Sequence, residues 1–201
     1  AIFYLVRHGE ADYSEMLEKG FWGFGRSFAP LSKENKLIEA AAIDERLKSA
    51  QLIVSSPYTR ALQTAAIISK ETGLKICVDI DLHEWEPDKT NQYTTSEEAF
   101  ELTREFNLHK GVYPKEQCLK WETLAEVRQR IRRVADKYAD YDKVIFVGHG
   151  MAFRTLTYIE HMKPAEIIEC TYTDDKKIAF IHFANHTKIQ VYRTIKLLKI
   201  M

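Results

Sequence analysis

The chain has 201 residues, of which 45% are hydrophobic, and this is enough for one well-packed core. Lysine plus arginine and aspartate plus glutamate number 29 each, which excludes the basic excess typical of proteins that bind nucleic acids or acidic membrane surfaces. We therefore predict a single domain over residues 1–201, with no nucleic acid and no membrane among its partners, and any anion-binding site must be local.

The cysteines and the start of the chain indicate the cellular setting. Cys77, Cys118 and Cys170 lie far apart and form no C-x-x-C pair, which argues against a disulfide framework and against a zinc site. No apolar run is long enough to cross a membrane, and residues 1–6 lack the basic flank and the length of a signal peptide. These features predict a cytoplasmic protein without a structural metal.

The first predicted strand, residues 2–6, leads directly into Arg7 and His8. In open α/β sheets the chemistry is placed where strands end and loops begin. A neutral imidazole can accept a phosphoryl group there only if cations screen the phosphoryl oxygens. A surface histidine with a purely structural role would fit the same residues, so the rest of the chain has to supply those cations.

Residues 11–30 follow and combine glycine with aromatic side chains. Glycine at this density opposes a regular helix or strand. The loop contains four aromatic residues, namely Phe21, Trp22, Phe24 and Phe28. These rings either rim a pocket or pack beneath the loop as a satellite core, and the sequence leaves the role of residues 20–28 open.

A helix is expected next, with Ser32 as its N-cap. Its apolar stripe at helical spacing consists of Leu37, Ala40, Ala41 and Leu47. We expect this stripe to pack in the core.

Residues 51–54 form a second apolar strand that runs into another helix. For this helix Ser56 is the expected N-cap, Pro57 takes the first helical position and Gly73 ends it. Arg60 then lies in the first turn, where free backbone N–H groups also favour an anion. It is a second cation at a second strand end, although an arginine on a solvated helix face would have the same spacing.

A third strand, residues 75–78, is followed by three carboxylates that compete for one role. Like charge from phosphoryl oxygens favours the protonated form of a neighbouring carboxyl group, as a general acid near neutral pH requires. Glu84, Glu86 and Asp88 all follow the strand closely, and physical reasoning alone does not choose among them.

Two Thr-x-x-Glu pairs mark helix starts in the next part of the chain. The first, at residues 95–98, predicts a helix that ends near residues 109–111, within an insertion over residues 89–121 that we expect to shape the substrate site. The second, at residues 123–126, opens an amphipathic helix. The apolar face of that helix consists of Leu124, Val127, Ile131, Val134 and Tyr138.

The amphipathic helix also carries a run of basic residues. The four arginines are Arg128, Arg130, Arg132 and Arg133. They are similar to a nucleic-acid-binding patch, but Glu126 and Asp136 lie among them, so we predict a solvated helix face instead.

The strongest strand pattern of the chain covers residues 143–147 and is followed by Gly148, His149 and Gly150. The two glycines let the backbone approach a ligand and hold the imidazole at the end of the strand. A histidine between glycines is often only a turn residue, but this one follows a strand as His8 does.

After this point we predict a helix over residues 151–159 and a short element over 165–170. Two strands, 178–183 and 188–193, are expected to form a hairpin through 184–186 that closes one edge of the sheet. Alternating strands and helices with antiparallel pairing at the end predict an α/β fold. We expect a three-layer sandwich with a mostly parallel mixed sheet and helices on both of its faces.

Three motifs fall just after predicted strands. They are R-H-G-E at residues 7–10, S-S-P-x-x-R-A-x-Q-T at 55–64 and V-G-H-G at 147–150. In this order they resemble the histidine phosphatase superfamily, which includes the cofactor-dependent phosphoglycerate mutases. The resemblance implies a phosphoglycerate mutase-like fold.

The resemblance also implies a reaction. His8 would attack phosphorus and become a phosphohistidine, while Arg7, Arg60 and His149 hold the phosphoryl oxygens. Glu84, which stands in an L-x-E sequence after the third strand, would protonate the departing oxygen before water completes hydrolysis. No metal and no cofactor are expected, and the substrate would be a small phosphorylated metabolite or a phosphoprotein.

Two departures from the mutase pattern favour hydrolysis over transfer. Ala11 and Ser14 stand where mutases carry threonine and asparagine after R-H-G, and the Tyr-Gly and Trp-Arg-Arg elements of mutases are absent after Glu84. Phosphoglycerate mutase-type phosphoryl transfer stays as an alternative enzyme function. From a different class, a non-catalytic phosphate-binding regulatory module is a further alternative, which the presence of all five site residues disfavours.

Overall fold

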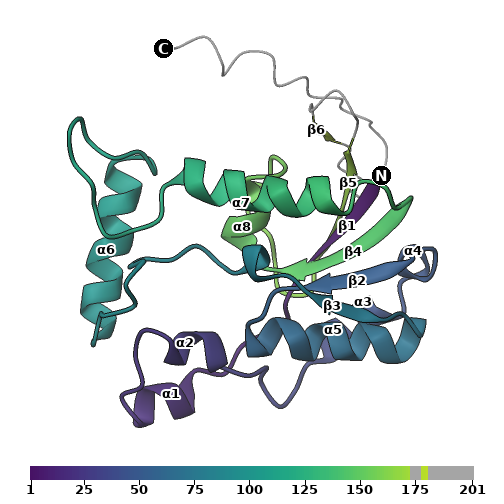
Figure 1. Cartoon of the computed structure of the whole chain (residues 1–201). Coiled ribbons are helices and arrows are strands. Elements are labelled where there is room, and N and C mark those ends of the chain that lie inside the picture. Colours follow the sequence, from purple (N-terminus) through teal and green to yellow (C-terminus); the bar gives the residue numbers. More distant parts are fainter. Residues whose placement is uncertain (173–177, 181–201) are drawn as a thin grey trace.

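Residues 1–172 and 178–180 are described by a computed structural model (Figure 1). Six strands form one sheet in the order β3-β2-β4-β1-β5-β6. Their bounds are β1 Ile2–Arg7, β2 Leu52–Ser55, β3 Ile76–Val78, β4 Lys143–Gly148, β5 Ile167–Tyr172 and β6 Ile178–Phe180. Strands β1 to β4 are parallel, whereas β5 pairs antiparallel with β1 and β6 antiparallel with β5. The predicted mostly parallel mixed sheet is confirmed.

Helices lie on both faces of this sheet, as expected for a three-layer sandwich (Figure 1). Their bounds are α1 Ser14–Glu18, α2 Gly25–Phe28, α3 Lys36–Ala42, α4 Glu45–Lys48, α5 Thr59–Thr72, the 3-10 turn η1 Ile80–Leu82, α6 Ser96–Leu108, α7 Leu124–Lys137 and α8 Gly150–Arg154. Helices α7 and α8 cover one face and α3 and α5 the other, while α6 lies to one side of the sheet. None of the helices in the described part of the chain is both long and apolar enough to cross a bilayer.

Side-chain alternation along the strands divides the interior into two cores. Phe3 and Leu5 of β1 pack in the core beneath α7 and α8, whereas Tyr4 and Val6 pack in the core beneath α3 and α5. Because β1 is covered on both faces, its sequence is a continuous apolar run. The buried strands β1 and β4 are therefore firm supports for the loops that follow them.

Both Thr-x-x-Glu helix starts are confirmed. The Thr95 hydroxyl accepts from the Glu98 N–H at 3.2 Å, and the Thr123 hydroxyl accepts from the Glu126 N–H at 3.1 Å. The Glu126 carboxylate also accepts from the Thr123 N–H at 2.7 Å, which completes a capping box in α7. In α6 the Glu98 carboxylate accepts from the N–H of Thr94 instead.

The helix expected from Ser32 is in fact two short helices, α3 and α4, and its predicted apolar stripe was wrong. Leu37 is exposed and its neighbour Ile38 is buried, and Leu47 is the one member of the stripe that is fully buried. The reason is that Asp44 caps α4 with its side chain, so the chain turns between the two helices. Residues on either side of this break do not share one helix face.

Helix α5 begins at Thr59, two residues later than expected, and its N-cap is Tyr58 rather than Ser56. Its end is as predicted, because Gly73 takes the left-handed conformation at φ 72°. The hydroxyl of Ser56 has another partner, described below.

The C-terminal part differs from the prediction in two elements. Helix α8 ends at Arg154 and not at Ile159, and the short element expected over 165–170 is the strand β5. Strand β6 pairs with β5 at the edge of the sheet, whereas its predicted partner, 188–193, and the connecting turn, 184–186, lie outside the described residues. The single domain over residues 1–201 stays a prediction.

Candidate active site

Three loops that follow parallel strands meet at one edge of the sheet. Arg7 of β1 lies opposite Gly148 of β4, and the next N–H, that of His8, donates to the Gly148 carbonyl at 2.9 Å. Ser55 of β2 lies opposite Val147 of β4. The three sequence motifs are therefore adjacent in space, as their positions after parallel strands predicted.

His8 is almost fully buried and has a partner at each ring nitrogen. Its Nδ1 lies 2.6 Å from the Gly9 carbonyl and must donate to it, since a carbonyl can only accept. Nε2 then accepts from Arg60 Nε at 3.2 Å. Burial, and then the Arg60 guanidinium, lower the pKa of His8 from 6.5 to about 3. The imidazole is neutral, and the lone pair of Nε2 faces the arginine.

His149 is fully buried, and its ring centroid lies 5.1 Å from that of His8. Its Nε2 is 2.8 Å from the hydroxyl of Ser56, which is the partner that sequence reasoning missed by treating this serine as a helix cap. The Tyr58 ring meets His149 edge-on at 4.9 Å. Burial, followed by the charge of Arg60, holds the pKa of His149 well below its usual value.

The guanidinium of Arg7 has one nitrogen with a hydrogen-bond partner in the protein and another, Nε, without one. Its Nη1 donates to the Met162 carbonyl. Its Nε, like Nδ1 of His149, is buried without a hydrogen-bond partner, and these are the two such side-chain atoms among residues 1–172 and 178–180. Because an unpaired buried polar atom is costly, two of them in one site, one of which is the N–H donor of Arg7, indicate a place for a ligand with acceptor atoms.

Glu84 lies against the start of α8, immediately after His149. Its Oε1 accepts from the N–H groups of Trp85 and Ala152 at 2.8 and 3.0 Å. Its Oε2 accepts from the Met151 N–H at 3.3 Å. The carboxylate is thus tied to the same segment that carries the second histidine, and free N–H groups at a helix start favour a negative charge there.

The two competing carboxylates have other surroundings. Asp88 is buried and accepts from the N–H groups of Thr90 and Gln92 at 2.8 and 3.3 Å, so it stabilises a turn. Glu86 lies 4.0 Å from His83, and burial is the main cause that raises its pKa. Neither carboxylate is hydrogen-bonded to α8 in the described structure, whereas Glu84 is.

Arg130 was predicted to lie on a solvated helix face, and this was wrong. Its guanidinium is buried and pairs with Glu122 through two bonds, of 2.6 and 2.9 Å. The same guanidinium donates to the carbonyls of Asp81, His83 and Glu84 at 2.7, 2.6 and 3.2 Å. It therefore holds the backbone of the segment that carries Glu84. The other three arginines of α7 are exposed, as predicted.

The expectation that residues 11–30 contain no regular helix was wrong, because the short helices α1 and α2 lie there. The glycine-rich segment 20–28 contributes polar groups to the site and not a satellite core. Phe21 and Phe28 stack on one another at 6.0 Å but are 50% and 60% exposed. Arg26 and Ser27 of α2 line a narrow cavity of about 10 Å³, which Arg60 and Glu84 also line. Sequence reasoning missed Arg26, although a lone arginine among glycines and aromatic residues was a usable signal.

The narrow cavity collects side chains from three separate segments. Those that carry polar groups include Arg26, Tyr58, Arg60, Glu84, Glu86 and Tyr93. The last of these belongs to the insertion over residues 89–121, which was expected to shape the substrate site. That expectation is consistent with the position of Tyr93.

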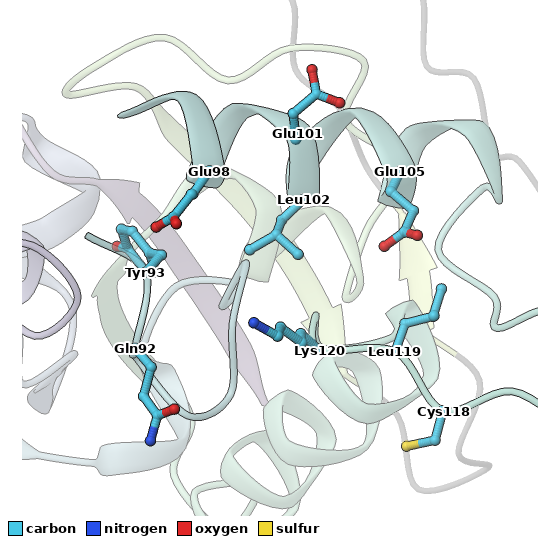
Figure 2. Close-up of a pocket in the computed structure, with 9 residues that line it drawn as sticks. All are labelled: Gln92, Tyr93, Glu98, Glu101, Leu102, Glu105, Cys118, Leu119 and Lys120. Carbon is cyan, nitrogen blue, oxygen red and sulfur yellow. The ribbon is translucent and has the colours of Figure 1, made fainter. Parts of the chain in front are cut away.

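A larger cavity of about 460 Å³ lies between α6 and two neighbouring segments (Figure 2). Figure 2 shows Glu98, Leu102 and Glu105 pointing from α6 toward this cavity, whereas Glu101 points away. The carboxylate of Glu105 accepts from the indole of Trp121 at 3.0 Å, so it is already engaged. This cavity contains none of the histidines and is distinct from the site above.

Comparison with known proteins agrees with the geometry. The profile of the histidine phosphatase superfamily (branch 1) matches residues 3–192. A protein of Hydrogenobacter thermophilus assigned as phosphoserine phosphatase 2 is 26% identical over 204 residues, which cover 94% of this chain and 93% of that protein. A protein of Yersinia enterocolitica assigned as phosphoglycerate mutase GpmB is 28% identical over 163 residues, covering 76% and 71% of the two chains.

The fold also has solved counterparts. A mycobacterial glucosyl-3-phosphoglycerate phosphatase superposes with a TM-score of 0.66 at 21% identity, covering 95% of this chain and 97% of that chain. A phosphoglycerate mutase of Bacillus anthracis superposes with a TM-score of 0.60 at 20% identity, covering 91% and 92%. With a family profile that spans nearly the whole chain and a matching three-layer sheet, the chain belongs to the histidine phosphatase superfamily and has the phosphoglycerate mutase-like fold.

Proposed function

We propose that the chain is a metal-independent phosphomonoester hydrolase that acts through a phosphohistidine on His8. One observation carries the proposal: Arg7 Nε and His149 Nδ1 are buried nitrogens without a hydrogen-bond partner, and they lie in the site of a neutral His8. A phosphoryl group supplies acceptor oxygens and an electrophilic phosphorus together. The names of relatives, which include phosphoserine and glucosyl-3-phosphoglycerate phosphatases, support a small phosphorylated metabolite as the substrate.

In the first step Nε2 of His8 attacks phosphorus, and the bond from phosphorus to the leaving oxygen breaks. Arg60 gives up its bond to Nε2 and donates to a phosphoryl oxygen, as do Arg7 Nε and His149 Nδ1 if Ser56 donates to the other nitrogen of that ring. The charge that gathers on the phosphoryl oxygens is thus met by fixed donors. No step requires a metal ion.

The leaving oxygen takes its proton from Glu84. Both short bonds to this carboxylate fall on Oε1, so Oε2, with its single bond of 3.3 Å, is the oxygen free to carry a proton. In the second step water attacks the phosphohistidine, Glu84 accepts the water proton, and inorganic phosphate leaves His8 neutral again. The net reaction converts a phosphomonoester and one water molecule into an alcohol and inorganic phosphate.

The test is to trap the intermediate. The wild-type protein is mixed with a substrate whose phosphoryl group is labelled, in the presence of EDTA, and the reaction is then quenched. The protein should carry labelled phosphate in a bond that is stable to alkali and labile to acid, as a phosphohistidine is. His8→Ala should remove this label and lower kcat by about four orders of magnitude or more without unfolding the domain. Undiminished labelling of the variant would place the nucleophile elsewhere.

The alternatives give different products. Phosphoglycerate mutase-type transfer, which the GpmB relative favours, would interconvert phosphoglycerates without net release of phosphate. A regulatory binding module would bind phosphate and yet release no nitrophenolate from p-nitrophenyl phosphate. The cytoplasmic location inferred from the sequence belongs to the same proposal.

A further inference from the structure

One cation of the narrow cavity has no part in the proposed reaction. Arg26 lines this cavity together with Arg60 and Glu84, and its backbone carbonyl accepts from Arg60 Nη1 at 2.9 Å. The loop that carries Arg26 is therefore tied to the phosphate-binding arginine. Its side chain is half-buried, and its guanidinium is hydrogen-bonded to the phenols of Tyr13 and Tyr93.

The geometry of the site places Arg26 on the leaving-group side. Arg60 is hydrogen-bonded to the His8 imidazole, whereas Arg26 lines the narrow cavity beside Glu84 and Glu86. The Glu84 carboxylate acts on the charge of both arginines. Because the proton donor faces the leaving oxygen, a cation beside it faces the organic part of a bound phosphomonoester rather than the phosphoryl group.

No carboxylate near Arg26 in the described part of the chain is placed to neutralise its guanidinium while Glu84 is protonated. Arg26 forms no ion pair with any carboxylate of residues 1–172 and 178–180. Glu84, the carboxylate that acts on it, must be protonated when it serves as the acid. Glu86 also lines the cavity, but it lies beside His83. The remaining partners of this half-buried guanidinium are the neutral phenols of Tyr13 and Tyr93, so an anionic group of the ligand would supply its counter-charge.

We propose that Arg26 binds a carboxylate of the substrate, so that the preferred substrates are phosphomonoesters of hydroxy acids. A guanidinium forms two parallel hydrogen bonds with a carboxylate, which fixes the orientation of the organic group as well as its charge. The assignment rests on the proposed hydrolase function and adds to it the substrate class and the residue that selects it.

The experiment compares substrates that differ in one carboxylate. O-phosphoserine is paired with O-phosphoethanolamine, and 3-phosphoglycerate with glycerol 3-phosphate. For the wild type, kcat/KM should be at least about tenfold higher for the carboxylate-bearing member of at least one pair, as expected for one charged hydrogen-bonded contact. Arg26→Met should remove this preference by lowering kcat/KM for the carboxylate substrate about 10-fold to 100-fold, with little change for its partner.

Two further variants keep the test sharp. Arg26→Lys, which keeps the charge but not the paired donors, should retain part of the preference. Arg104→Met removes an exposed arginine of α6 that pairs with Glu101, and it should behave as the wild type. A circular dichroism melt of each variant shows that the fold is intact.

The outcomes separate the inference from the function on which it rests. If the wild type hydrolyses p-nitrophenyl phosphate but shows no preference within either pair, the role of Arg26 is wrong and the hydrolase function stands. If Arg26→Met slows both members of a pair equally, Arg26 acts on the phosphoryl group or on Glu84 and the inference also fails. If no phosphomonoester is hydrolysed, both proposals fail together.

Discussion

The two halves of the site are held in place by different means. The phosphoryl half, which we define as Arg7, His8, Arg60 and His149, is built on residues that follow or adjoin buried parallel strands, and backbone hydrogen bonds of the sheet set their positions. The leaving-group half, defined as Glu84 and Arg26, lies on a loop and on the short helix α2, and side chains of other segments hold the backbone there. Substitutions outside the site should therefore disturb the leaving-group half more than the phosphoryl half.

Substitution of Glu84, the proposed acid, should have the largest effect that distinguishes the leaving-group half from the phosphoryl half. Glu84→Gln should slow hydrolysis of alkyl phosphates by about 10²- to 10⁴-fold, because an alkoxide cannot leave unprotonated. For p-nitrophenyl phosphate the loss should be much smaller, since nitrophenolate leaves without a proton. Steady-state kinetics with both substrates measure the difference.

Glu86→Gln is the matched control for that experiment. Glu86 follows Glu84 in the same loop, but its carboxylate lies 4.0 Å from His83, so its removal should affect both substrates alike. An equal loss for both substrates in the Glu84 variant, or the differential loss in the Glu86 variant, would contradict the assignment of the acid.

The next effect should come from the clamp behind the acid. Arg130→Met leaves the Glu122 carboxylate buried without its partner, which should lower the free energy of unfolding by about 3 to 5 kcal/mol. The variant should also lose more rate with alkyl phosphates than with p-nitrophenyl phosphate, because it frees the backbone of Glu84. Urea unfolding and the ratio of the two rates provide the measurements.

Arg128→Met is the control for the clamp, because Arg128 is an exposed arginine on the same helix. It should change neither the stability nor the rate ratio. The double variant Arg130→Met with Glu122→Gln should recover part of the stability, since no charge is then left unpaired. A rate loss in Arg130→Met that is the same for both substrates would mean that the clamp supports the fold and not the acid.

A smaller effect concerns the phosphoryl half, where the folded chain holds histidines neutral. The pKa of His8 is about 3 in the folded chain and 6.5 for a free histidine side chain, the value taken for the unfolded chain. As the pH falls below 6.5, the unfolded chain therefore binds a proton at His8 that the folded chain does not bind. Stability from this group is complete above pH 6.5 and declines toward pH 3. By pH 5 the loss is about 2 kcal/mol.

His8→Gln tests this dependence on pH. Urea unfolding of the wild type should lose more stability between pH 7 and pH 5 than unfolding of the variant, by about 2 kcal/mol. The pKa of His149 is lowered mainly by burial and by Arg60, which remain in both proteins, so its contribution largely cancels in the difference. Identical losses in the two proteins would show that His8 is not held neutral by the fold.

The smallest effect should come from Ser56, which touches only one ring nitrogen of His149. Ser56→Ala should cost about 0.5 to 1.5 kcal/mol of stability and lower kcat/KM less than about tenfold for every substrate alike. Ser69→Ala removes a hydroxyl that donates to Leu74 at the other end of α5, and serves as control. Its kcat/KM should equal that of the wild type.

The sequence could predict the phosphoryl half because each of its motifs directly follows a strand. The carboxyl ends of parallel strands meet at one edge of a sheet, so Arg7, His8 and His149 had to be neighbours once β1 and β4 were recognised. Arg60 was found because the first turn after β2 reaches the same edge. Only the exact start of α5 was wrong, and the reason is that the Ser56 hydroxyl bonds to a residue 93 positions away.

The leaving-group half was harder to predict because its contacts join loops to one another. Arg130 lies three residues after Val127 and four before Val134, so the helical period does place it on the buried face of α7. Its charge argued for solvent, and only the pairing with Glu122 explains its burial. The position of Arg26 depends on where the short helix α2 approaches the loop that carries Glu84, and no periodic pattern specifies that.

The carboxylate of Glu84 is held by backbone groups and not by side chains, so neighbouring residues can be substituted without loss of its contacts. Its carboxylate is gripped by the main-chain N–H groups of positions 85, 151 and 152, which every amino acid except proline provides. Exchange of the side chains at these positions leaves the grip intact as long as the backbone path is kept. The side chains around Glu84 can thus change while its carboxylate, the proposed acid, keeps its place.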